Sequence, residues 1–137
     1  PSAVLITHKD NTGIQSIADM KGKKAAQTMT SNWGKLAEAQ GADIVKVEGF
    51  NESVQLVASK RAEGTFNDEL SAALYMKEQP NAPLQIIEHP DYTIETAFLM
   101  EKGNEELAEE INKILKEMRE DGTLSKISMK WFDVDVS

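Results

Sequence analysis

Short apolar runs rich in β-branched residues alternate with amphipathic stretches along the first two thirds of the chain. Such runs predict buried strands, whereas apolar positions three or four residues apart predict helices. The expected strands are 3–7, 24–28, 44–47, 64–67, 84–87 and 94–100. Helical segments are expected at 16–20 and after the capping residues Ser31 or Asn32, Asn51 and Asp68. This alternation predicts an α/β fold with a mainly parallel sheet and flanking helices.

The last third of the chain has a helical pattern. A long helix is expected after Asn104, ended by Asp121 and Gly122, and a second helix is expected from Thr123. The apolar positions of the long helix fall on one stripe, made of Leu107, Ile111, Ile114, Leu115 and Met118. A stripe of this kind requires a covering surface.

Charge and composition exclude several classes of function. The formal net charge of −8 disfavours nucleic acid and anionic membranes, because both bind clustered basic residues. The chain has no cysteine, which excludes disulfides and cysteine-bound metals. His8 and His89 are isolated, and no nucleophile, nucleotide or metal motif is present. We therefore expect no enzymatic activity, no metal and no cofactor.

Two segments at predicted strand ends carry polar groups suited to binding. Thr30, Ser31, Asn32 and Trp33 lie at a helix start, where free backbone amides and hydroxyls can receive a carboxylate. The alternative is that Ser31 or Asn32 only caps the helix. Asp68 follows the strand 64–67, where it can hold an ammonium group or simply cap the next helix.

Together these segments offer an anion receptor and a cation receptor at matching sheet ends, as a zwitterionic amino acid requires. Trp33 and Phe50 each lie beside a cap and could line such a pocket. Trp131 and Phe132, at helical spacing, are expected in the core instead.

Several stretches resemble the extracellular solute-binding proteins of family 3. The likeness lies in the run Ile17–Lys24, in Asn112–Met118, in Asp121-Gly122-Thr123-Leu124 and in the ending Lys130-Trp131-Phe132. Within that family, Thr30–Trp33, Gly49–Asn51 and Asn67-Asp68 resemble the branch that binds cystine and related polar amino acids. Thr30 departs from the pattern, since a glycine is common there.

The resemblance implies a two-lobed fold that closes on an amino acid. Residues 1–95 resemble the second lobe, and 96–137 resemble the crossover strand and C-terminal helices of the first lobe. The N-terminal part of the first lobe is then missing, together with its aromatic clamp and its carboxylate-binding arginine. Residue by residue, the resemblance implies that Ser31 and Asn32 contact the ligand carboxylate and that Asp68 contacts its α-amino group, with Thr30, Trp33 and Phe50 beside them.

The function implied is that of the amino-acid-binding component of an ABC importer, with cystine favoured and a permease as partner. Its location would be extracytoplasmic, either periplasmic or lipid-anchored at the cell surface. The chain is expected to be a truncated form that packs on a second copy, for example as a domain-swapped dimer, or on a separate first lobe. Two alternatives are a ligand-sensing domain of the same fold in a signalling protein and a lyase-like enzyme, which would need an added general base.

Overall fold

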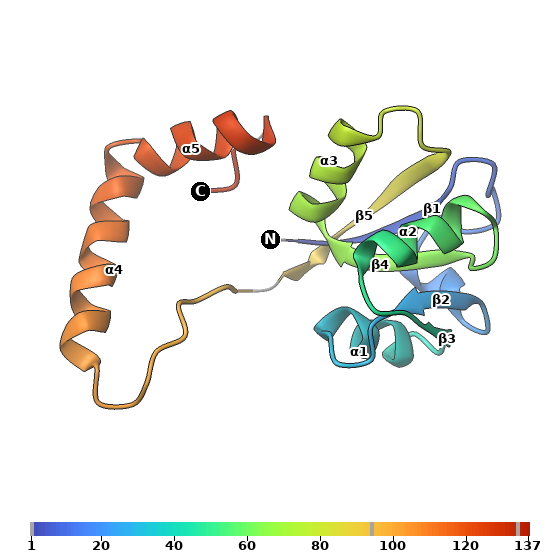
Figure 1. Cartoon of the computed structure of the whole chain (residues 1–137), viewed down its shortest axis with the longest axis horizontal. Coiled ribbons are helices and arrows are strands. Elements are labelled where there is room, and N and C mark those ends of the chain that lie inside the picture. The colour runs from blue at the N-terminus through green and yellow to red at the C-terminus, as the bar shows by residue number, and fades with distance from the viewer. Residues whose placement is uncertain (1, 94, 134) are drawn as a thin grey trace. The chain divides into compact units, whose positions relative to one another are not determined.

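The computed structural model of the chain describes residues 2–93, 95–133 and 135–137. It divides into two compact units, Pro1–Ile94 and Glu95–Ser137 (Figure 1). The first unit is a sheet with helices on both faces, and the second consists of an irregular segment followed by two helices. The predicted α/β class is confirmed.

The sheet of the first unit contains five strands in the order β3-β2-β4-β1-β5. The strands are β1 (Ser2–His8), β2 (Lys24–Gln27), β3 (Asp43–Lys46), β4 (Gly64–Asp68) and β5 (Leu84–Thr93). β2 is parallel to both β3 and β4, whereas β1 is antiparallel to both β4 and β5. The sheet is therefore mixed: β2, β3, β4 and β5 share one direction, and β1, which lies between β4 and β5, opposes them.

Helices cover both faces of this sheet (Figure 1). The helices of the first unit are η1 (Ile17–Met20), α1 (Asn32–Ala39), α2 (Phe50–Ala58) and α3 (Glu69–Glu78). One core cluster joins Val4 and Ile6 of β1 to residues of α2 and α3, and the other joins Ala3 and Leu5 to residues of α1 and η1. Successive side chains of a strand point to opposite faces, so β1 contributes to both cores.

Three local predictions are wrong. The residues His89–Asp91 are of turn-forming types and separate the expected strands 84–87 and 94–100, which predicts a turn there. They lie inside β5 instead, where a register shift opposite Ser2 and Ala3 absorbs the extra residues. The strand expected at 94–100 does not form: residues 95–100 are irregular, and Ile94 lies outside the described residues. In addition, α2 is capped by Gly49 and begins at Phe50, so Asn51 is in the first turn and is not the cap.

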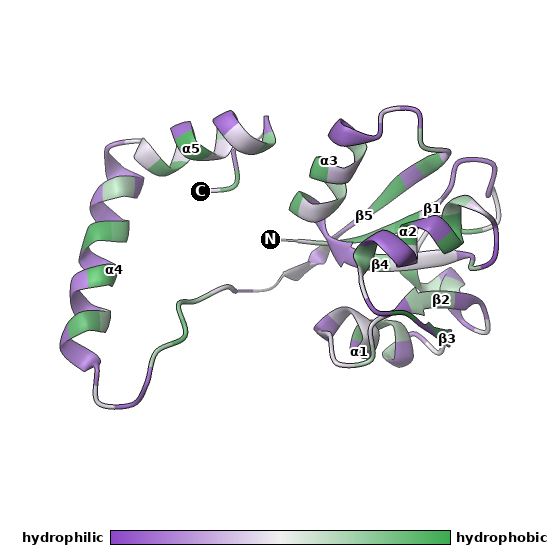
Figure 2. Ribbon diagram, viewed as in Figure 1, coloured by the Kyte–Doolittle hydropathy of each residue, from purple (hydrophilic) through white to green (hydrophobic). Residues whose placement is uncertain are grey.

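The second unit contains α4 (Glu105–Glu120) and α5 (Thr123–Phe132), joined through Gly122 with a φ of 76°. A left-handed φ favours glycine, which explains the sharp end of α4 at this position. Figure 2 shows apolar bands alternating with polar ones along α4. No residue of α4 is buried within the unit, and its apolar residues Leu107 and Ile114 remain about half exposed.

Trp131 was expected in the core, but 60% of it is exposed. Its ring contacts Lys130, whose Nζ lies 5.2 Å from the ring centroid. Residues with large exposed apolar side chains gather in this unit: Phe98, Leu99, Leu107, Ile114, Ile127, Met129, Trp131 and Val136. The two amphipathic helices thus leave much of their apolar surface uncovered by their own unit.

Replacement of Phe66 tests the core of the first unit. This residue of β4 is 1% exposed, so Phe66→Ala should lower the free energy of unfolding by about 3–5 kcal/mol. Urea denaturation followed by circular dichroism measures the change. Leu74→Ala on α3, where the side chain is 39% exposed, is the control and should cost under about 1 kcal/mol. Equal losses in the two variants would contradict this description of the core.

Candidate functional site

Three helices begin at one edge of the sheet in the first unit. The parallel strands β2, β3 and β4 end there, and α1, α2 and α3 follow directly from them (Figure 1). Their N-cap residues are Ser31, Gly49 and Asp68. The positive ends of three helix dipoles therefore lie at the sheet edge where ligands of open α/β sheets bind.

Ser31 is the N-cap of α1. Its hydroxyl accepts a hydrogen bond from the backbone amide of Gly34 at 3.0 Å and donates one to the carbonyl of Thr28, also at 3.0 Å. Asn32 is the first residue of the helix, and both Asn32 and Thr30 are exposed. Ser31, and not Asn32, is therefore the residue that caps α1. Its two hydrogen bonds hold the 28–31 loop against the start of the helix.

Asp68 caps α3 with both carboxylate oxygens. Oδ1 accepts from the backbone amide of Ser71 at 2.8 Å, and Oδ2 accepts from the Ser71 hydroxyl at 2.9 Å. Each carboxylate oxygen can accept about two hydrogen bonds, so a half-buried Asp68 keeps capacity for a further donor. Because β2 and β4 are neighbours in the sheet, the Ser31 and Asp68 caps follow adjacent strands.

The two predicted aromatic residues flank this edge from opposite faces of the sheet. Trp33 packs on the core beneath α1 and contacts Tyr92 of β5, with ring centroids 6.3 Å apart. Phe50 packs on the core beneath α2 and α3 and meets Tyr75 edge-on, with ring centroids 5.8 Å apart. Sequence reasoning missed Tyr92, because its segment reads as a turn, and Tyr75, which gave no distinguishing signal.

Sequence reasoning also missed a buried amide beneath the site. Gln27, the last residue of β2, is 3% exposed. Its Nε2 donates to the hydroxyl of Thr65 and to the carbonyl of Phe66, each at 3.3 Å. The sequence signal for this buried contact is that a polar residue, Gln27, ends an otherwise apolar strand.

A second missed residue is Gly34, in the first turn of α1. A Cβ at this position would lie 2.6 Å from the carbonyl oxygen of Thr28. This is well below van der Waals contact, and the obstructing atom belongs to the backbone. Only glycine therefore lets the first turn of α1 approach the 28–31 loop so closely.

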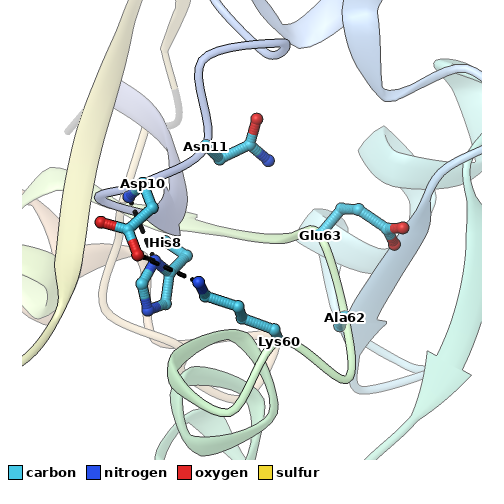
Figure 3. Close-up of a pocket in the computed structure, with 6 residues that line it drawn as sticks. All are labelled: His8, Asp10, Asn11, Lys60, Ala62 and Glu63. Carbon is cyan, nitrogen blue, oxygen red and sulfur yellow. Dashed lines mark hydrogen bonds and ion pairs between the residues drawn. The ribbon is translucent and has the colours of Figure 1, made fainter.

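A polar hollow of about 240 Å³ lies at the opposite edge of the sheet (Figure 3). Its lining residues are His8, Asp10, Asn11, Lys60, Ala62 and Glu63. Lys60 Nζ donates to Asp10 Oδ2 at 3.0 Å, and this hydrogen bond lowers the pKa of the Asp10 carboxyl group. His8 Nδ1 accepts from the Asp10 amide at 3.1 Å. The candidate ligand residues are not part of this hollow.

The second unit has an apolar groove of about 590 Å³ along α4. The segment 96–100 forms one side and α4 the other, with the lining residues Thr96, Ala97, Phe98, Met100, Ala108, Ile111, Asn112, Leu115 and Arg119. Predicted stripe residues Ile111 and Leu115 therefore line a groove within this unit.

In the ranges 2–93, 95–133 and 135–137, no three histidine, cysteine or acidic residues are grouped so that they could hold a metal ion. None of the helices described is both long and apolar enough to cross a bilayer.

The bacterial extracellular solute-binding proteins of family 3 are described by a family model that matches residues 2–134. The chain belongs to this family. The L-cystine-binding protein TcyA of Bacillus subtilis is 46% identical over 135 residues, which make up 98% of this chain and 50% of TcyA. The chain thus spans about half the length of the curated relatives it matches.

Solved structures support the same fold. The unliganded, open L-cystine solute receptor of Neisseria gonorrhoeae is 41% identical, with a TM-score of 0.76, and the match covers 99% of this chain and 58% of that one. An ancestral amino acid-binding protein, described as a precursor of cyclohexadienyl dehydratase, is 30% identical with a TM-score of 0.78, over 95% of this chain and 56% of that one. Family membership and fold are confirmed, whereas the residue roles stay predictions.

Replacement of Gly34 tests the geometry of the 28–31 loop. Gly34→Ala should displace the start of α1 and shift the amide resonances of residues 28–35, because the added methyl group meets the Thr28 carbonyl. Two-dimensional NMR measures the shift. The free energy of unfolding should fall by about 1–3 kcal/mol. In the control Gly13→Ala, the nearest atom is 3.8 Å from the new Cβ, so the same resonances should stay in place. Unchanged resonances in Gly34→Ala would contradict the close approach.

Proposed function

We propose that this chain supplies one side of the ligand site of an ABC importer's amino-acid-binding component, with cystine as the favoured ligand. One observation carries the proposal: the helix start capped by Ser31 and the Asp68 carboxylate follow adjacent strands at one sheet edge. An α-amino acid presents a carboxylate and an ammonium group one carbon apart, so it needs an anion receptor beside a cation receptor.

The carboxylate is proposed to bind at the start of α1. The amide of Gly34 is bonded to the Ser31 hydroxyl, and the amide of Lys35 is bonded to the Ser31 carbonyl. Helix geometry leaves the amides of Asn32 and Trp33 for an acceptor outside the helix. The dipole of α1 contributes about 0.3–1 kcal/mol towards an anion at this position. Ser31 and Asn32 are the proposed carboxylate contacts, with Thr30 beside them.

The α-amino group is proposed to bind Asp68. Its oxygens already accept two hydrogen bonds from Ser71, which hold the carboxylate in a defined orientation. A charge-assisted bond from an ammonium group to such a preorganised carboxylate is about twice as strong as a neutral hydrogen bond. Trp33 and Phe50, held by Tyr92 and Tyr75, are proposed to shield the ligand from either side.

The preference for cystine rests on the relatives named for L-cystine, which share 46% and 41% of aligned residues with this chain. Binding is favoured over catalysis because the similar ancestral protein linked to a dehydratase is itself described as amino acid-binding. A sensing domain of the same fold would use the same contacts, and a signalling segment attached to the chain would distinguish it from an importer component.

The second unit is proposed to belong to the first lobe of the complete site, with 1–95 as the second lobe and 96–137 as the first-lobe segment. Its exposed apolar side chains and the groove along α4 need a covering surface. A second copy or a separate first lobe would provide it, and the permease would receive the ligand. The proposed location is outside the cytoplasm, in the periplasm or anchored by lipid at the cell surface.

Replacement of Asp68 tests the proposed site. Asn is as good an N-cap as Asp, so Asp68→Asn preserves the start of α3 while removing the negative charge. Isothermal titration calorimetry with L-cystine should show binding weakened by about tenfold to hundredfold, because a charge-assisted bond is lost. Arginine and glutamine, titrated in parallel, measure the preference for cystine.

A second variant tests the proposed carboxylate receptor at Ser31. Ser31→Asp keeps a good N-cap but places a negative charge beside the ligand carboxylate, so it should weaken binding at least as strongly. Glu105→Gln in the second unit changes the charge by the same amount as Asp68→Asn and should leave the affinity unchanged. Cystine binding that is insensitive to both Asp68→Asn and Ser31→Asp would refute the site, and no heat with any of these amino acids would refute binding by the chain alone.

Light scattering tests the covering of the second unit. The chain should self-associate at high micromolar concentration, because exposed Ile114 and its neighbours gain from burial. Ile114→Glu should shift the population towards the monomer, whereas Leu74→Glu, at a residue of similar exposure on α3, should not. A strict monomer at every concentration would contradict self-association and would leave a separate first lobe as the proposed cover.

A further inference from the structure

The strands β2 and β4 are neighbours with very little backbone pairing. Ala25 and Gly64 form the one residue pair between them, whereas β2 pairs with β3 over four residues. The backbone ladder between β2 and β4 therefore stops two residues before Gln27. Beyond this point, the separation of the two strand ends has to be held by side chains.

The side chain of Gln27 crosses this gap. Its Nε2 donates to the Thr65 hydroxyl and to the Phe66 carbonyl of β4, both at 3.3 Å. Gln27 and Thr65 are 3% and 0% exposed, so water does not readily replace these bonds. One amide group thus takes the place of the missing backbone ladder.

Both ends of this bridge are close in sequence to the proposed receptors. Gln27 precedes Thr28, whose carbonyl accepts a hydrogen bond from the Ser31 hydroxyl. Phe66, whose carbonyl accepts from Gln27, precedes Asp68 by two residues. We infer that Gln27 is a positioning residue that sets the separation between the carboxylate receptor at Ser31 and the ammonium receptor at Asp68. The inference rests on the proposed function, because that separation matters only to a ligand that engages both receptors.

The chemistry of the bridge requires a side chain of this length with two N–H donors. An apolar side chain of similar volume would fill the space but leave the Thr65 hydroxyl and the Phe66 carbonyl without this donor. The strand ends would then separate or admit water. A binding site tolerates only about 0.5 Å of misplacement, so this change would weaken a ligand held at both ends.

Gln85 provides a matched control in the same unit. Its Nε2 also donates two hydrogen bonds, to the Thr7 hydroxyl at 3.0 Å and to the Asn11 carbonyl at 2.9 Å. These bonds lie at the opposite edge of the sheet, since Thr7 pairs with Gly64 at the start of β4. Gln27→Met and Gln85→Met therefore remove the same kind of contact at the two ends of the sheet.

The experiment compares the 137-residue chain with these two variants by two measurements. Amide hydrogen exchange is followed at Gly34 and Ser71, whose N–H groups are bonded to the two caps. Calorimetry with L-cystine gives the affinity. In Gln27→Met, exchange at both amides should accelerate and binding should weaken by about tenfold. In Gln85→Met, the exchange rates at both amides and the affinity for L-cystine should stay within about twofold of those of the unchanged chain. This should hold even if the free energy of unfolding falls as much as in Gln27→Met.

Unchanged cap exchange in Gln27→Met, or equal acceleration in both variants, would overturn the inference. Unchanged affinity in a chain that binds cystine would overturn it as well. If no form binds an amino acid, the proposed binding by the chain fails, while the exchange data still decide whether Gln27 holds the caps. If Gln27→Met does not fold, Thr65→Val removes a single acceptor and should give a smaller acceleration at the same two amides; no acceleration would overturn the inference.

Discussion

The first unit depends on one strand that is buried on both faces. Residues 3–8 of β1 are all buried, and β1 pairs with β4 on one side and β5 on the other. Its alternate side chains enter the core under α1 and the core under α2 and α3. Because β1 opposes its neighbours, its first residues lie at the edge where β2, β3 and β4 end, and the Ser2 amide donates to Glu69 Oε1 at the start of α3.

The same edge shows how stability and binding can use the same atoms. Ser31 and Asp68 satisfy amides at helix starts, which any helix requires. These contacts also fix the orientation of a hydroxyl and a carboxylate that follow adjacent strands. Capping therefore does not compete with the proposed ligand role, because a cap residue is already ordered before a ligand arrives. Aromatic pairs, Trp33 with Tyr92 and Phe50 with Tyr75, pack against the cores on the two faces.

The second unit presents the opposite situation. Its helices are well formed and strongly amphipathic, yet the apolar side of α4 has no sheet of its own unit to cover it. Helices of this kind gain most of their stability from packing rather than from intrinsic propensity. The chain spans about half the length of TcyA and of the gonococcal receptor.

By itself, the sequence determined the local features: alternating strands and helices, the cap at Asp68, a cap at Ser31 or Asn32, the amphipathic α4 and the family. Periodicity and capping depend on neighbours within a few residues, so they can be predicted from the chain. Only the tertiary structure decided the direction of β1, the continuation of β5 through His89–Asp91, the exposure of Trp131 and the bridge made by Gln27. Apolar patterning reports that a residue is buried, but it does not report which distant strand it meets or in which direction.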